Sequence, residues 1–125
     1  MRNLVPLALG ALLLGTLGGC DNADSTTIHS NCTKGRVVGL SCNGTLIQLT
    51  SGDLSLGKTI TYGGTIYYHV VGTHSALPAN TAAGTELTFQ LRSPTEAEAA
   101  PQPCLAIYQG FDVPQLVVEN VGCQR

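Results

Sequence analysis

The chain has no tryptophan, one methionine and two phenylalanines, and only 11% of its 125 residues are charged. Six lysines and arginines stand against eight aspartates and glutamates, which gives a formal net charge of −2, and the basic residues form no cluster. Nucleic-acid binding generally requires a basic face or stripe that neutralises phosphates. The sequence therefore predicts no nucleic-acid partner.

Motifs that would carry catalysis or bind a cofactor are also missing. The chain contains no G-x-S-x-G elbow, no H-E-x-x-H pair, no P-loop and no G-x-G-x-x-G turn. Zinc sites usually show close cysteine pairs such as C-x₂-C, and thioredoxin-like redox sites need C-x-x-C, but neither spacing occurs. We therefore expect a non-catalytic protein that binds no metal and no cofactor.

The only long apolar run lies within the first twenty residues. Arg2 is the single charged residue before Cys20, and the chain is apolar from Leu4 to Leu17. This run has the length of the central region of a secretory signal peptide, and it is too short to span a bilayer comfortably. It therefore predicts export from the cytoplasm.

The end of this run, Leu17-Gly18-Gly19-Cys20, resembles the lipobox of bacterial lipoproteins. The resemblance implies that residues 1–19 are a signal peptide and that Cys20 becomes thioether-linked to a diacylglycerol, with a further acyl chain such as palmitate on its amine. Two or three acyl chains anchor a protein stably, since each buried CH₂ contributes about 0.8 kcal/mol. The alternative is an ordinary cleaved signal peptide with Cys20 in a disulfide.

The expected location is extracytoplasmic, and the expected partner of the lipid is a membrane. Asp21 resembles the inner-membrane retention signal of enterobacterial lipoproteins, whereas other phyla use acidic residues near the cysteine as a surface-export signal. The inner membrane, the outer membrane and the cell surface therefore all stay open. Residues 20–31 are polar and lack periodicity after the cysteine, so we interpret them as a flexible tether.

Without Cys20, four cysteines remain, which is an even number suited to an oxidising compartment. If residues 33–41 form one unbroken strand, Cys32 and Cys42 lie roughly 33 Å apart, whereas disulfide-bonded Cα atoms lie within about 7 Å. If the last two strands form a hairpin near Val113, Cys104 and Cys123 face each other. A disulfide between them would leave Cys32 to pair with Cys42. These arguments conflict, and we favour bridges from the first strand to the C-terminal hairpin. Two disulfides would contribute roughly 2–4 kcal/mol each.

Abundant glycine and threonine and a scarcity of helix formers after residue 20 favour short strands joined by turns. Asn43-Gly44 predicts a type I′ hairpin, and Gly63-Gly64 predicts a second hairpin. The expected strands are Lys34–Ser41, Thr45–Thr50, Lys58–Tyr62, Thr65–Val71, Thr85–Arg92, Cys104–Tyr108 and Gln115–Val121. Residues 32–125 should therefore form one all-β domain of about six to seven antiparallel strands, either a small sandwich or an OB-like barrel.

Ser93–Pro103 is polar and rich in proline, so we expect an exposed loop there. The frame Cys32…GRVVG…Cys42…LIQL, with the late segment CLAIY, is similar to small uncharacterised lipoproteins of gliding-type bacteria. That resemblance covers most of the expected domain and carries no known activity.

Few side chains are candidates for chemistry. His69 and His74 would point to opposite faces of one strand, so a shared metal site would require a turn at Gly72. Glu96 and Glu98 lie in the proline-flanked loop, and we interpret them as solvating charges rather than as the fixed carboxylate pair of a glycosidase.

Tyrosines are the best candidates for a ligand-binding surface, because exposed aromatic rings can stack on sugars or anchor a protein partner. The four are Tyr62, Tyr67, Tyr68 and Tyr108. Tyr67 and Tyr68 are adjacent, so one should face outward and the other inward. The alternative, which we favour, is that the tyrosines complete the core of a domain without tryptophan.

Three hypotheses about function follow. The preferred one is a non-catalytic, lipid-anchored β-domain of the cell envelope that binds a protein or a glycan. The second is an inhibitor of an extracytoplasmic hydrolase such as lysozyme, with Ser93–Pro103 inserted into the enzyme cleft. The third is a small enzyme that uses His69 or His74 as its acid or base.

Overall fold

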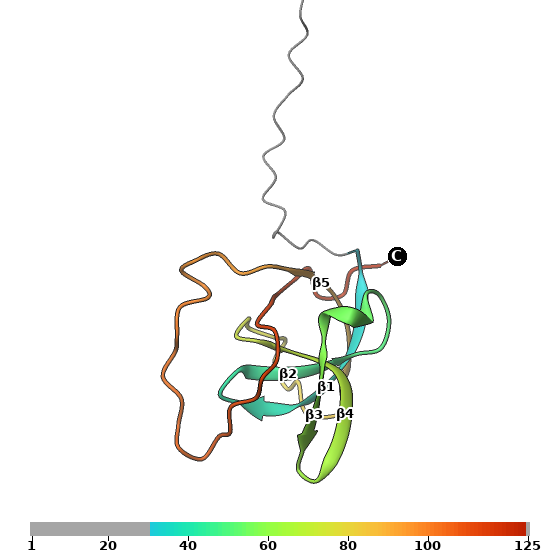
Figure 1. The fold of residues 1–125 in the computed structure, drawn as a ribbon. Helices are drawn as coiled ribbons and strands as arrows, with labels where there is room; N and C mark the ends of the chain where they lie inside the picture. The colour runs from blue at the N-terminus through green and yellow to red at the C-terminus, as the bar shows by residue number, and fades with distance from the viewer. Residues whose placement is uncertain (1–30, 125) are drawn as a thin grey trace, which may run out of the picture.

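The computed structural model of the protein describes residues 31–124 (Figure 1). The expected signal peptide (residues 1–19), the lipidation site Cys20 and the tether up to Ser30 lie outside the described residues. Among residues 31–124 the one helical element is the short 3₁₀ turn η1 (Leu54–Leu56), and none of the helical structure there could cross a membrane. The described domain is therefore all-β, as the composition predicts.

Six antiparallel strands form one open sheet in the order β3-β4-β2-β1-β5-β6. β1 and β2 lie in the middle of the sheet, and β3 and β6 are its edges. The strands are β1 (Thr33–Ser41), β2 (Gly44–Leu49), β3 (Lys58–Tyr62), β4 (Thr65–Thr73), β5 (Glu86–Arg92) and β6 (Val117–Glu119). The expected number of strands is confirmed, and six of the seven expected strand positions lie within two residues of the observed bounds.

A single parallel bridge partly closes this open sheet. Gly72 in β4 pairs with Gln115, which lies just before β6. The Gly72 N–H donates to the Pro114 carbonyl at 2.9 Å, and the Leu116 N–H donates to the Gly72 carbonyl at 2.9 Å. Because β6 then pairs with β5, the chain around Leu116 connects the β4 side of the sheet with the β5 side.

Each face of the sheet carries its own apolar cluster, which gives the domain a sandwich-like layering. Neighbouring residues such as Leu46 and Ile47 point to opposite faces of a strand, so β2 and β4 supply buried residues to both clusters. The first cluster contains Ile47, Leu49, Val71, Phe89, Leu91, Leu116 and Val118. The second contains Val38, Leu46, Ile60 and Val70, with Tyr62, Tyr67, Phe111 and Val113 packed against it.

The two expected hairpin turns have different outcomes. Gly63 and Gly64 both have positive φ, 58° and 83°, between the paired residues Tyr62 and Thr65, as a type I′ turn requires. In the first hairpin only Gly44 has positive φ, 81°, so the type I′ prediction is wrong. The turn residues there are Cys42 and Asn43, and Gly44 follows them as the left-handed residue.

The prediction of a strand at Cys104–Tyr108 is wrong. These residues form a turn in which the Tyr108 N–H donates to the Leu105 carbonyl at 3.0 Å. The backbone directly after this segment bonds to the β1–β2 turn, because the Cys42 N–H donates to the Gln109 carbonyl at 2.9 Å. The C-terminal hairpin centred near Val113 therefore does not form, and β6 pairs with β5 instead.

Both disulfides connect an end of β1 to the C-terminal part. Cys32 is bonded to Cys123 with Cα atoms 5.9 Å apart, and Cys42 is bonded to Cys104 with Cα atoms 5.2 Å apart. β1 runs unbroken from Thr33 to Ser41, which keeps Cys32 and Cys42 apart. The expectation of bridges from the first strand to the C-terminal segment is confirmed, although that segment forms no hairpin. The competing Cys104–Cys123 pairing is wrong.

Candidate functional site

The connection from β5 to β6, residues 93–116, is the most prominent irregular part of the described chain, and we call it the connecting loop. Figure 1 shows it (orange to red) leaving β5, swinging far out beside the sheet and returning to β6. Connections longer than about 12–15 residues without secondary structure of their own are uncommon in compact domains and are frequently functional. The connecting loop and its contacts are therefore the first candidates for a functional site.

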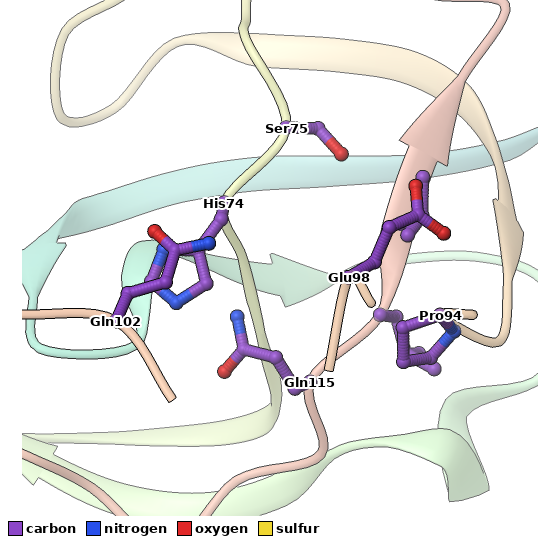
Figure 2. A pocket seen from close by; sticks show the side chains of 8 residues that line it. His74, Ser75, Pro94, Glu98, Gln102 and Gln115 are labelled. Atoms are coloured by element: carbon purple, nitrogen blue, oxygen red, sulfur yellow. The ribbon is translucent and has the colours of Figure 1, made fainter. Parts of the chain in front are cut away.

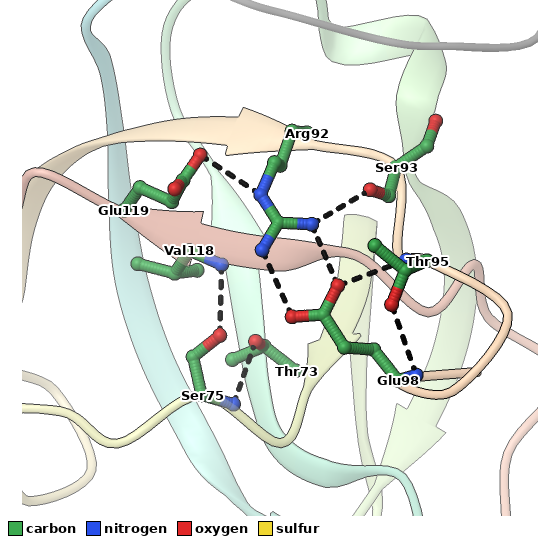
Figure 3. Close-up of polar contacts among 8 residues, drawn as sticks. All are labelled: Thr73, Ser75, Arg92, Ser93, Thr95, Glu98, Val118 and Glu119. Atoms are coloured by element: carbon green, nitrogen blue, oxygen red, sulfur yellow. Dashed lines mark hydrogen bonds and ion pairs between the residues drawn. The ribbon is translucent and has the colours of Figure 1, made fainter. Parts of the chain in front are cut away.

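The start of the connecting loop is held by a capping box and an arginine (Figure 3). The Thr95 N–H donates to Glu98 Oε1 at 2.9 Å, and the Glu98 N–H donates to Thr95 Oγ1 at 3.2 Å, which is the reciprocal pattern of a capping box. The two terminal nitrogens of Arg92 donate to the two oxygens of Glu98 at 2.7 and 2.8 Å. Glu98 is therefore a structural anchor, and its interpretation as a solvating charge is wrong.

Arg92 also reaches the edge strand, since its Nε lies 3.0 Å from Glu119 Oε1 in β6. Its hydrogen bonds to Glu98 are the main reason why the pKa of Arg92 lies above its ordinary value. The same hydrogen bond, followed by that from the Thr95 N–H, lowers the pKa of Glu98 to about 2. Arg92, Glu98 and Glu119 thus form a three-membered ion network that fixes the loop start to β5 and β6.

The far part of the loop is tied to the turn between β1 and β2. Besides the Cys42–Cys104 disulfide, Asn43 Oδ1 accepts a hydrogen bond from the Phe111 N–H at 2.8 Å. The Asn43 carbonyl accepts another from Gln115 Nε2 at 2.8 Å. Phe111 also packs against Tyr62, with ring centroids 5.7 Å apart. The loop is long, yet it is fixed at both ends and in its middle.

Between these attachments a short segment, Leu105–Tyr108, projects into solvent, and we call it the distal turn. Leu105 is 65% exposed and Ile107 is 80% exposed, the two highest values among the exposed large apolar side chains of the described residues. Tyr108 is half-buried. The distal turn follows Cys104 directly, so its position relative to β1 is fixed by a covalent bond.

A polar pocket of about 160 Å³ lies between the loop start and the end of β4 (Figure 2). His74 and Gln102 lie on one side of it and Glu98 and Pro94 on the other, with Gln115 below and Ser75 above. The eight lining residues are His74, Ser75, Pro94, Glu98, Gln102, Gln115, Leu116 and Val117. The pocket therefore depends on the same ion network that holds the loop.

The four tyrosines do not gather into one surface. Tyr62 and Tyr67 pack against the second apolar cluster, and Tyr62 Oη donates to the Leu40 carbonyl at 3.0 Å. Tyr68 is 56% exposed, so adjacent Tyr67 and Tyr68 face opposite sides as expected. Tyr108 belongs to the distal turn. A role of any of them in ligand binding stays a prediction.

The two histidines lie in different environments. His69 is in a bulge of β4 with a positive φ of 61°, and its Nδ1 lies 3.0 Å from the Leu54 carbonyl. His74 follows β4 and lines the pocket. Across residues 31–124 no group of three or more histidine, cysteine, aspartate or glutamate side chains could hold a metal ion.

Ser75, His74 and Glu98 are the residue types of a hydrolase triad in one pocket, but they are not connected as one. Ser75 Oγ accepts a hydrogen bond from the Val118 N–H at 2.9 Å (Figure 3). Both oxygens of Glu98 bind Arg92. A nucleophile and its base need a hydrogen bond between them, and the described residues offer no such bond between His74 and Ser75.

No protein-family model matches the chain, and no curated protein sequence matches it. The arguments about function therefore rest on the geometry described above.

Sequence reasoning missed three positioning residues. Glu98 could have been found from the T-x-x-E pattern of Thr95–Glu98, which is the signature of a capping box, whereas no sequence pattern shows that Arg92 binds it. The sequence indicates only a turn role for Asn43, because no neighbouring residue shows that its side chain reaches Phe111.

Proposed function

We propose that the chain is a non-catalytic, lipid-anchored domain of the bacterial cell envelope that binds a protein partner with its distal turn. The observation that carries this proposal is the exposure of Leu105 and Ile107, 65% and 80%, on a turn that a disulfide holds in place. Fully burying a leucine or isoleucine side chain contributes about 1.5–3 kcal/mol each. A partner groove that covers both would gain an apolar anchor.

The attachment of the distal turn favours binding, because a preformed segment loses less conformational freedom in a complex. The Cys42–Cys104 disulfide precedes the turn, and the Cys42 N–H bond to Gln109 follows it. Exposed apolar side chains that lie together on one surface are typical of interaction sites. This geometry supports a protein partner over a glycan for the distal turn.

The orientation of the domain supports the same function. The tether would enter at Cys32, whereas Cys42, which holds the distal turn, lies at the other end of β1. Nine strand residues span about 30 Å. An acylated Cys20 would therefore hold the domain by one end and present the distal turn at the other.

In-cell photocrosslinking tests the proposal. A photoreactive amino acid at position 107 should give a discrete crosslinked protein in the bacterium that produces the chain, and the double variant Leu105→Ser/Ile107→Ser should lose co-purification with that protein. The matched control is position 66, because Ile66 is 57% exposed on β4, away from the distal turn. Crosslinks at 107 only to lipid, or equal crosslinks at 66 and 107, would contradict a protein partner of the distal turn.

Inhibition of a hydrolase is the second candidate function, and the fixed loop start favours it. Thr95–Ala100 is exposed yet ordered by the capping box and Arg92, as an inserted inhibitory segment would need to be. A lysozyme turbidity assay tests it. Full lysozyme activity in the presence of excess protein would remove this candidate for that enzyme class.

A further inference from the structure

The pocket between His74 and Glu98 contains hydrogen-bonding groups that the domain itself does not use. The His74 ring and the Gln102 side-chain amide make no hydrogen bond with the other described residues, and both residues are exposed at the pocket mouth. Ser75 Oγ accepts from the Val118 N–H, so its own proton is available to a ligand. Three different polar groups thus converge on one small space (Figure 2).

The remaining polar groups of the pocket are already engaged. Gln115 Nε2 donates to the Asn43 carbonyl at 2.8 Å, and the Glu98 carboxylate accepts from Arg92 and from the Thr95 N–H. Glu98 is the one acidic or basic side chain that lines the pocket apart from the His74 ring, and both of its oxygens already bind Arg92, which also pairs with Glu119 outside the pocket. A ligand would therefore meet a carboxylate that is already hydrogen-bonded rather than a free anion or cation.

Apolar surface completes the pocket. Pro94, Leu116 and Val117 contribute carbon atoms to the lining. A pyranose ring combines an apolar C–H face with hydroxyl groups that both donate and accept hydrogen bonds. The pocket offers the matching combination of aliphatic carbon with an amide, a hydroxyl and an imidazole.

We propose that this pocket is a subsite for one neutral, hydroxyl-rich sugar ring. Its volume of about 160 Å³ equals the share of roughly five water molecules in the liquid, which suits a single ring and excludes a longer buried oligosaccharide. The rest of a glycan chain would extend into solvent past the exposed residues His74 and Gln102. This site lies apart from the distal turn and does not depend on it.

The test is a ¹H–¹⁵N NMR titration of the disulfide-bonded domain with methyl glucoside and N-acetylglucosamine as neutral probes. Glucuronate and glucosamine serve as charged comparators. We expect dissociation constants in the millimolar range, because one ring makes few contacts. The shifted amide signals should belong to residues 74–75, 98, 102 and 115–117.

Two variants test the unpaired groups. His74→Ala and Gln102→Ala should each weaken binding roughly fivefold, which corresponds to the loss of one hydrogen bond. Gln109→Ala is the matched control, since it removes an exposed amide from the same loop outside the pocket, and it should bind normally. Unchanged dispersion of the NMR spectrum shows that each variant is folded.

Three outcomes would overturn the subsite. The first is the absence of any chemical-shift change at the highest sugar concentration, and the second is tighter binding of a charged comparator than of the neutral probes. The third is a set of shift changes centred on Lys34 and Thr88, which line two other pockets. Sugar binding that survives in the Leu105→Ser/Ile107→Ser variant separates this site from the distal turn, so either proposal can fail alone.

Discussion

Single residues at the β1–β2 turn decide whether the connecting loop can be fixed. Gly44 has a φ of +81°, and a Cβ at this position would lie 2.1 Å from the Thr73 carbonyl oxygen. Asn43 beside it makes the side-chain bond to Phe111. The turn therefore needs glycine at position 44 and, at position 43, a side chain with a hydrogen-bond acceptor.

Gly44→Ala should destabilise the domain more than Gly84→Ala. Both glycines have positive φ, but a Cβ at Gly84 would find nothing within 4 Å. The backbone conformation alone costs alanine about 1–2 kcal/mol, and the clash at Gly44 adds about 1–3 kcal/mol. Urea unfolding of both variants gives the difference, and equal losses would show that the Thr73 contact relaxes freely.

At the scale of elements, the connecting loop is held by two independent devices, an ion network at its start and a disulfide near its middle. Arg92 and Glu98 belong to the first device, and Cys42 and Cys104 belong to the second. Each attachment can be removed by substitution while the other stays in place, so the contribution of each can be measured separately.

The ion network should be sensitive to acid. The pKa of Glu98 is about 2 in the folded domain against an ordinary value of 4.5, so the folded state binds the proton less tightly than the unfolded chain. The stabilisation is thus complete above about pH 4.5 and is lost as the pH falls toward 2. A ¹³C titration of the Glu98 carboxyl should show this shift, and Arg92→Gln should return the pKa toward 4.5. An unshifted Glu98 in the unmodified protein would contradict the network.

Removal of the middle attachment should loosen the far part of the loop. Cys42→Ser/Cys104→Ser should cost about 2–4 kcal/mol in the free energy of unfolding. Amide hydrogen exchange should accelerate at Tyr108 and Phe111, while β5 stays protected. Cys32→Ser/Cys123→Ser is the matched control, because it removes a disulfide at the opposite end of β1. The same exchange pattern in both variants would show that the disulfides act only on global stability.

At the scale of the whole molecule, the proposed function depends on attachment through Cys20. Cys20→Ala should abolish labelling with radioactive palmitate and move the protein out of the membrane fraction of the producing cells. The mature domain should keep its fold, because the contacts that hold it lie among residues 31–124. Continued membrane association of Cys20→Ala would contradict a lipid anchor.

Local sequence patterns predicted much of the sheet. One pattern is the alternation of Leu87, Phe89 and Leu91, which predicts a strand, and the other is the Gly63-Gly64 pair, which predicts a hairpin turn. Both depend only on neighbouring residues, and the structure confirms both elements. The pattern failed at Cys104–Tyr108, where apolar residues suggested a strand. Leu105 and Ile107 are exposed on a segment that is attached to the β1–β2 turn on both sides, by the Cys104 disulfide and by the Gln109 carbonyl, contacts that sequence spacing does not encode.

The sequence by itself determined the all-β class, the turns that need glycine, and the distance along β1 that keeps Cys32 and Cys42 apart. These properties follow from backbone geometry over a few neighbouring residues. The tertiary structure alone decided that Glu98 is bound by Arg92, that Asn43 holds Phe111, and that His74 and Gln102 share a pocket. Such contacts join residues from separate strands and loops, so they exist only after the sheet has brought those segments together.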